Sequence, residues 1–286
     1  MKRTDAGKAI FSYILLTLAY FAAIMYIPTA VASGVTATVV DIALKLVFAA
    51  AAILTAVKLL GADFPKIQAK RFFRALFVTA IVGWGYIVLN YVSAMGEVDR
   101  TYSPLQTAHI IAVYLLYCLG VGLVEEALNR RLLLDSLASV MPKDTALVIS
   151  AVCFSLGHAV NFVSSPNLVW ATVGQLIYTF IFGLFFGAVY LRSRSFGTVV
   201  ILHALFDFAG MVWEAFSSAT ADAAMTDIAP IYILSYVRMF LPMLIAALFL
   251  IRPAKVPEIN ALWERKDAIT AERGNHEENL TYPQAE

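Results

Sequence analysis

The chain has 286 residues, of which 60% are hydrophobic and only 14% are charged. This composition leaves too little polar surface to cover a soluble globule of that length, so lipid must be the solvent. The formal net charge of +1 excludes bulk electrostatic attraction to nucleic acid, and no nucleic-acid partner is expected.

Apolar stretches of about 20 residues, the length that a membrane-spanning helix needs, recur along the chain. They predict transmembrane helices at residues 9–32, 36–60, 72–95, 106–128, 145–163, 170–191, 196–216 and 228–251. The expected fold class is therefore all-α: a polytopic membrane protein with a bundle of about eight transmembrane helices in a single domain at 1–252. Beyond it the composition becomes polar, which predicts a solvated, flexible cytoplasmic tail with one short helix at 253–286.

Basic residues give the expected orientation, because cytoplasmic loops are enriched in Lys and Arg. Such residues precede the first span and recur in every second loop, whereas the intervening loops carry almost no positive charge. Both termini are therefore predicted to face the cytoplasm. A cleaved signal peptide over residues 1–32 is the alternative for the first span, although its apolar run exceeds the roughly 7–15 residues of a typical signal sequence.

Ionisable residues inside spans are costly unless they are paired or face the bundle interior. Asp41 and Lys45 lie four residues apart, so we expect them to neutralise each other as a structural pair. Three other clusters lack such a simple explanation. They are Glu125-Glu126…Arg130, Phe154…His158 and His203…Asp207.

Helical spacing separates the two neighbouring glutamates of the first cluster. Glu126 and Arg130 are four residues apart and can form an ion pair, whereas Glu125 points about 100° away. Glu125 is thereby left free for chemistry. In each of the other two clusters the motif residues are one helical turn apart and share a face.

The ordered set of three motifs resembles the CPBP family of membrane proteins, which includes the type II CAAX prenyl endopeptidases and bacterial relatives linked to bacteriocin processing and self-immunity. The family pattern is Glu-Glu-x-x-x-Arg, then Phe-x-x-x-His, then His-x-x-x-Asn or Asp, and this chain has all three in that order. The resemblance implies an intramembrane endopeptidase of the glutamate type. It also implies a peptide or protein substrate, prenylated or otherwise membrane-associated, and a location in the cell membrane, here a bacterial inner membrane.

By this resemblance, Glu125 and His158 hold and activate a water molecule, and His203 with Asp207 faces the oxyanion of the tetrahedral intermediate. A carboxylate held away from bulk water accepts a proton more readily than a solvated one. Asp207 stands where the prenyl endopeptidases have Asn and donates a hydrogen bond only when protonated, so orienting His203 is its alternative role. Structural support is expected from Glu126, Arg130 and Phe154.

No cofactor is expected from the resemblance. One Glu and two His are suitable zinc ligands, but the His-Glu-x-x-His motif is absent, so a zinc-dependent peptidase is the less favoured variant. Two other functions stay open. A non-proteolytic membrane scaffold or self-immunity protein would use the same residues as a buried polar network, and an ion-coupled transporter would use them as a proton or ion path. The chain shows no repeated halves, which disfavours the transporter.

Overall fold

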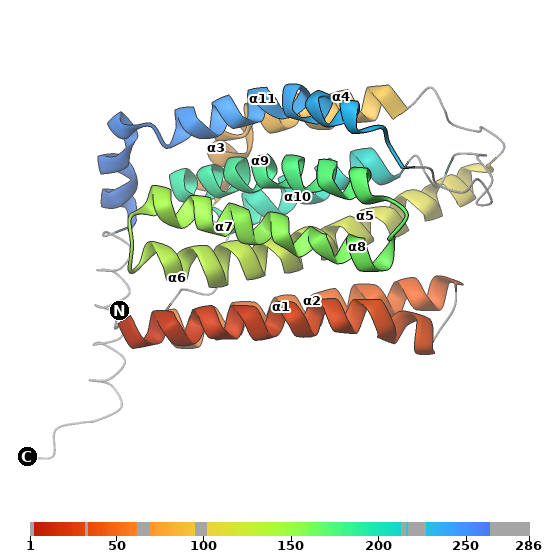
Figure 1. Cartoon of the computed structure of the whole chain (residues 1–286), viewed down its shortest axis with the longest axis horizontal. Coiled ribbons are helices and arrows are strands. Elements are labelled where there is room, and N and C mark those ends of the chain that lie inside the picture. The colour runs from red at the N-terminus through yellow and green to blue at the C-terminus, as the bar shows by residue number, and fades with distance from the viewer. Residues whose placement is uncertain are drawn as a thin grey trace, which may run out of the picture.

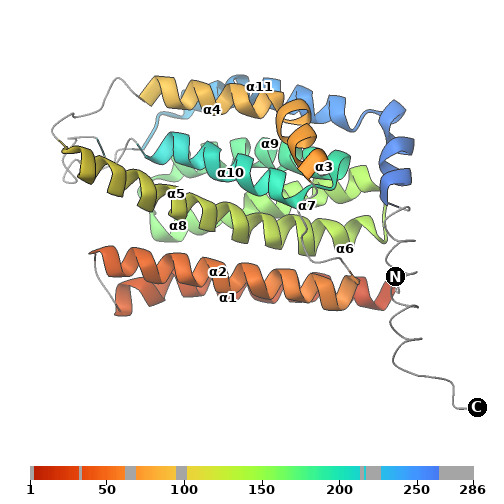
Figure 2. The same ribbon diagram turned by 180° about the vertical axis from the view of Figure 1, so that it is seen from behind.

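The computed structural model describes residues 3–31, 34–61, 69–94, 102–212, 216 and 227–263. Within these ranges the chain forms helices and contains no strand, which confirms the predicted all-α class. The long helices lie side by side in one bundle (Figures 1 and 2). Their length and apolar composition make the protein a multi-pass membrane protein.

The α-helices in chain order are α1 (Arg3–Val31), α2 (Gly34–Leu60), α3 (Ala69–Arg74), α4 (Ile81–Ala94), α5 (Pro104–Glu126), α6 (Asp135–Ala138), α7 (Lys143–Gly157), α8 (Asn161–Ser164), α9 (Val169–Ser193), α10 (Phe196–Met211) and α11 (Ile233–Leu250). Two π-helical segments are η1 (Ala75–Thr79) and η3 (Ala127–Leu134). Short 3₁₀ turns are η4 (His158–Val160), η6 (Pro230–Tyr232) and η7 (Pro253–Lys255).

Six helical stretches of the described chain are long and apolar enough to cross a membrane. The predicted span at 72–95 corresponds to a pair of helices bent by 65°, which makes seven if the pair counts as one span. The predicted span at 196–216 corresponds to α10, which has only 16 residues. Each of the eight predicted spans therefore falls on a helix, while the number that cross the membrane stays a prediction.

The helix α9 is the most buried of the candidate spans and packs against α7 and α11. The helix α5 packs against both α10 and α2. The pair α1 and α2 forms one edge of the bundle, and α4 and α11 form the opposite edge (Figures 1 and 2). The helices that carry the three sequence clusters, α5, α7 and α10, thus lie between these edges.

Two glycines let neighbouring backbones approach closely in this middle part. A Cβ atom on Gly122 of α5 would lie 2.9 Å from the carbonyl oxygen of Val200 on α10. A Cβ atom on Gly183 of α9 would lie 3.1 Å from the Cα atom of Ala151 on α7. Both distances are shorter than ordinary van der Waals contacts. Glycine at these positions therefore brings α5 onto α10 and α9 onto α7.

The N-terminus of α9 is held by a carboxylate from a distant segment. Asp227 accepts hydrogen bonds from the backbone N–H groups of Trp170 and Ala171, each at 2.8 Å, as well as from Ile228 at 2.9 Å. Loss of water raises the pKa of the Asp227 carboxyl, but these N–H groups outweigh that effect and hold the pKa below its ordinary value. The segment that precedes α11 is thereby attached to the start of α9.

The first residues of the predicted tail form the short helix expected there, and this helix packs against the bundle instead of being solvated. Residues 256–263 are helical, and Ile259 and Trp263 are buried. The Trp263 indole donates to the Leu191 carbonyl at 3.3 Å, and the Arg194 guanidinium lies 3.6 Å from the Trp263 ring centre. The apolar positions 256, 259 and 263 have helical spacing inside a polar composition, so their burial was not predicted. The rest of the tail lies outside the described residues.

The N-terminal end of α1 and the segment 253–263 lie at the same end of the bundle (Figure 1). Such an arrangement is compatible with the predicted orientation, in which both termini face one side of the membrane. The assignment of that side to the cytoplasm rests on the basic loops and stays a prediction.

Candidate active site

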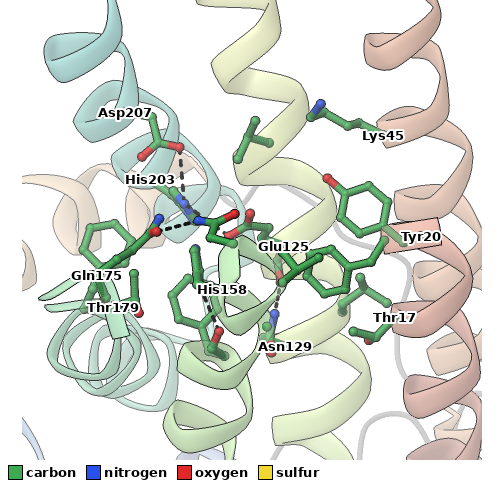
Figure 3. A pocket seen from close by; sticks show the side chains of 18 of the residues that line it. Thr17, Tyr20, Lys45, Glu125, Asn129, His158, Gln175, Thr179, His203 and Asp207 are labelled. Atoms are coloured by element: carbon green, nitrogen blue, oxygen red, sulfur yellow. Dashed lines mark hydrogen bonds and ion pairs between the residues drawn. The ribbon is translucent and has the colours of Figure 1, made fainter. Parts of the chain in front are cut away.

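A cavity of about 610 Å³ lies inside the bundle, lined by parts of α1, α2, α5, α7, α9 and α10 among others. The four residues predicted to be catalytic all line it: Glu125 from α5, His158 from η4, and His203 and Asp207 from α10. Figure 3 shows them around one space, with Gln175 of α9 also at its wall. The three sequence clusters therefore meet at one cavity.

The imidazole of His203 lies among three carboxylates of the described chain. Its Nδ1 atom lies 2.9 Å from Glu126 Oε1, and because a carboxylate only accepts, Nδ1 carries a proton. Its Nε2 atom lies 3.7 Å from Glu125 Oε2 and 3.5 Å from Asp207 Oδ2. Both separations exceed a normal hydrogen bond. Nε2 is therefore committed to neither carboxylate. In the imidazolium form, which the surrounding carboxylates favour, Nε2 also carries a proton and can donate it to a third group.

The predicted ion pair between Glu126 and Arg130 is present and completely buried. Arg130 Nε lies 2.8 Å from Glu126 Oε2, and both side chains are 0% exposed. Arg130 also donates to Ser150 Oγ at 3.4 Å, and its guanidinium lies 5.2 Å from the Phe154 ring centre. Because Ser150 and Phe154 belong to α7, this pair connects the end of α5 to the helix that carries the second motif.

His158 begins the 3₁₀ turn η4, where α7 ends. Its Nδ1 atom lies 3.1 Å from the Phe154 carbonyl oxygen. A carbonyl only accepts, so Nδ1 carries a proton, and in a neutral imidazole Nε2 is then an acceptor. The Phe154 ring also packs edge-on against the imidazole, with the ring centres 5.3 Å apart. Phe154 thus fixes both the position and the tautomer of His158.

Two carboxylates of the cavity are more exposed than the histidine that lies between them. The Glu125 and Asp207 side chains are 21% and 22% exposed, whereas that of His203 is 4% exposed. The rings of Phe182 and Phe186 lie 5.0 Å and 5.7 Å from the His203 ring. Water in the cavity therefore reaches the two carboxylates more readily than the imidazole.

The π-helix η3 begins directly after the two glutamates. A π-helix is wider than an α-helix, and such segments occur frequently at functional sites. Within it, the Asn129 amide donates to the Glu125 backbone carbonyl at 2.9 Å and accepts from the Tyr13 hydroxyl at 3.1 Å. The wide turn that follows Glu125 is therefore fixed both locally and by α1.

The contribution of the first two helices to the cavity was not predicted from the sequence. Thr17 and Tyr20 of α1 and Lys45 of α2 line it (Figure 3), as does Tyr13. The polar groups at 13, 17 and 20 share one face of an apolar span, a pattern that would have identified them. The predicted pair of Asp41 and Lys45 is present, with Nζ and Oδ2 2.5 Å apart. Lys45 also borders the cavity, which its expected structural role did not include.

No group of three or more His, Cys, Asp or Glu side chains in the described part of the chain is arranged to hold a metal ion. The carboxylates and imidazoles of the cavity are instead engaged with one another, with Arg130 or with backbone carbonyls. The expectation that the protein needs no cofactor stays a prediction.

Comparison with known protein families gives a match that agrees with the motifs. Residues 107–209 match the family described as type II CAAX prenyl endopeptidase Rce1-like. The matched segment runs from α5 to α10 and contains all three motifs, which confirms the resemblance seen in the sequence. The helices α1 and α2 lie outside it. No curated protein matches the chain.

Proposed function

Because the Rce1-like match supports membership of the chain in the CPBP family, a family with peptidase members, we propose that the protein is an intramembrane endopeptidase of the glutamate type. The observation that carries the proposal is that Glu125, His158, His203 and Asp207 line one cavity although they come from separate helices. The proposed reaction is hydrolysis of a peptide bond. It consumes one water molecule and yields a new carboxylate and a new amine.

In this proposal Glu125 and His158 activate the water. The Glu125 carboxylate removes a proton from the water as its oxygen attacks the peptide carbonyl carbon. His158 Nε2 accepts the second water hydrogen, because Nδ1 is engaged with the Phe154 carbonyl. Glu125 then delivers the proton to the leaving nitrogen as the C–N bond breaks. One carboxylate therefore serves as base and as acid.

His203 and Asp207 stabilise the oxyanion that forms in the attack. His203 Nε2 faces the cavity and donates to the negative oxygen, while Nδ1 is held by Glu126 at 2.9 Å. Asp207 lies 3.5 Å from the same Nε2, which supports the role of orienting His203 and stabilising its positive charge. In this arrangement Asp207 needs no proton of its own.

Glu126 and Arg130 act as positioning residues in the proposal. Their buried ion pair holds Glu126 Oε2, which leaves Oε1 free to bind His203. The imidazole is thereby fixed before the substrate arrives, and such preorganisation is a principal source of catalytic stabilisation. No resident metal or other cofactor is part of this mechanism.

The proposed substrate is a peptide or protein that reaches the cavity within the membrane, prenylated or otherwise membrane-associated. The family match supports a substrate of this class. The proposed location is the cell membrane, a bacterial inner membrane by comparison with the bacterial members of the family. A cavity of about 610 Å³ accommodates a few residues of an extended peptide at a time.

The test compares wild-type protein with Glu125→Gln and His158→Ala in membranes that contain a library of membrane-anchored peptides. Hydrolysis in H₂¹⁸O incorporates one ¹⁸O atom into each new C-terminal carboxylate, which mass spectrometry detects. We expect both variants to lose this label by at least 100-fold, in line with removal of a general base. Asp144→Asn, at an exposed position outside the cavity, is the control and should retain activity.

Chelators should leave the labelled products unchanged, and loss of activity on chelation would favour the zinc-dependent variant. Undiminished biological function in both cavity variants would overturn the peptidase and favour a non-proteolytic scaffold or self-immunity protein. Proton-linked uptake by proteoliposomes, with no ¹⁸O incorporation, would indicate the transporter instead.

A further inference from the structure

A second cavity, of about 520 Å³, lies at the end of the bundle where α9 and α11 end and where α3 begins. Basic loops predict this end to be cytoplasmic. Five basic side chains and one carboxylate line the cavity: Arg71, Arg74, Arg192, Arg252, Lys255 and Glu258. They come from α3, from the end of α9 and from the segment after α11, so the fold brings together charges that are far apart in the sequence.

Ordinary structural roles account for some of these charges. Glu258 forms ion pairs with Arg192 and with Lys255, the latter at 2.5 Å. Arg252 donates to the Phe249 carbonyl at 2.8 Å, near the C-terminus of α11, where a cation is favoured by the helix dipole. One carboxylate therefore balances one of two cations, and the cavity keeps an excess of four positive charges.

Arg71 and Arg74 have no such role in the described part of the chain. They lie three residues apart on α3, so their side chains share a face, and no described carboxylate lies within ion-pair distance of either. Their planar guanidinium groups match the oxygens of a phosphate group better than they match a single carbonyl. The excess charge and the free guanidinium groups point to a phosphate-bearing anion.

Apolar side chains line the same cavity and indicate that the anion carries a hydrocarbon chain. Val78 and Phe249 are 66% and 61% exposed. In a membrane protein such exposed apolar side chains face lipid, and here they lie beside the basic group. The cavity is therefore basic at headgroup depth and apolar towards the membrane interior, as an anionic phospholipid requires.

We propose that this cavity is a binding site for the phosphate headgroup of an anionic phospholipid, with Arg71 and Arg74 as its main ligands and with an acyl chain along Val78 and Phe249. Basic pockets between transmembrane helices at the cytoplasmic side bind such headgroups in other membrane proteins. The site is distinct from the cavity that contains Glu125, and the proposal does not depend on the peptidase activity.

The test measures lipid retention by full-length protein purified in detergent, using native mass spectrometry with added phosphatidylglycerol or phosphatidylcholine. Wild-type protein should retain phosphatidylglycerol at least tenfold better than phosphatidylcholine. The double variant Arg71→Gln/Arg74→Gln should lose most of this preference. The matched control Lys58→Gln/Lys70→Gln removes two exposed positive charges outside the cavity and should keep it.

A variant that is expected to increase lipid retention excludes misfolding as the cause of the losses. Glu258→Gln removes the carboxylate and frees Arg192 and Lys255, so phosphatidylglycerol retention should increase. If millimolar inorganic phosphate displaces bound phosphatidylglycerol as effectively as added lipid does, the site binds a free phosphate anion and not a lipid. That result would overturn the acyl-chain part of the proposal. Equal losses in the arginine variant and its lysine control, or no loss in either, would overturn the site itself.

Discussion

Arg130→Met tests how much the buried ion pair contributes to the fold, because methionine keeps an apolar chain of similar length and removes the charge. At 2.8 Å and an effective dielectric constant of about 20, the attraction between the two charges is about 6 kcal/mol. Removing one partner of a buried pair usually costs about 3–5 kcal/mol, since the other charge is left unpaired. Glu126 retains His203 as a partner, so we expect a loss near 3 kcal/mol.

The measured quantity is the free energy of unfolding in detergent micelles, determined by steric trapping and by SDS titration. The double variant Glu126→Gln/Arg130→Met leaves no unpaired charge and should lose less than Arg130→Met alone. Lys8→Met is the control, because the exposed pair of Lys8 and Asp5 at 3.9 Å should contribute less than about 1 kcal/mol. If Arg130→Met loses no more stability than Lys8→Met, the buried pair does not support the fold in the way argued above.

Two further predictions concern the helix contacts that position the cavity. Gly122→Ala places a Cβ atom 2.9 Å from a carbonyl oxygen of α10, so it should lower the free energy of unfolding by about 1–3 kcal/mol and, by displacing α10, lower hydrolysis about 10–100-fold. Gly85→Ala is the control, because its Cβ meets nothing within 4 Å, and it should change neither quantity. Equal effects of the two variants would contradict the contact. Asp227→Asn should reduce the hydrogen-exchange protection of the Trp170 and Ala171 amides at neutral pH. The pKa of Asp227 is lowered from its ordinary value of 3.8, so the wild-type protection should be complete at pH values above 3.8 and disappear only as the pH falls through the lowered pKa. The variant should show no such loss of protection in acid.

The features that the sequence predicted well are local ones. Long apolar runs form helices because every backbone hydrogen bond in lipid must be satisfied within the segment. Spacing of four residues correctly predicted the pairs of Asp41 with Lys45 and of Glu126 with Arg130. The meeting of the three clusters at one cavity was expected only through the family resemblance, since no local pattern encodes a contact between α5 and α10.

The features that the sequence did not reveal depend on tertiary packing. Helical spacing indicated Asp207 as the neighbour of His203, yet the shorter contact of His203 is with Glu126 on another helix. The bend of 65° near Ala80 and the contribution of α1 to the cavity also arise between segments. The packing of the short helix at 256–263 was not predicted, because its apolar positions are few and their burial depends on a partner surface.

The π-helix η3 gives the segment 127–134 a particular sensitivity to its length. A π-helix holds more residues per turn than an α-helix, so deletion of one residue would allow ordinary α-helical bonding. An insertion or deletion that the segment does not absorb by such a change of bonding would rotate every later side chain of that helix by about 100° relative to Glu125 and Glu126. Arg131 and Asp135 would leave their buried partners, Tyr190 and Arg194. In related genes, exchanges of one residue for another should therefore be tolerated here far more often than insertions or deletions, and the length of the segment would be inherited together with the glutamates.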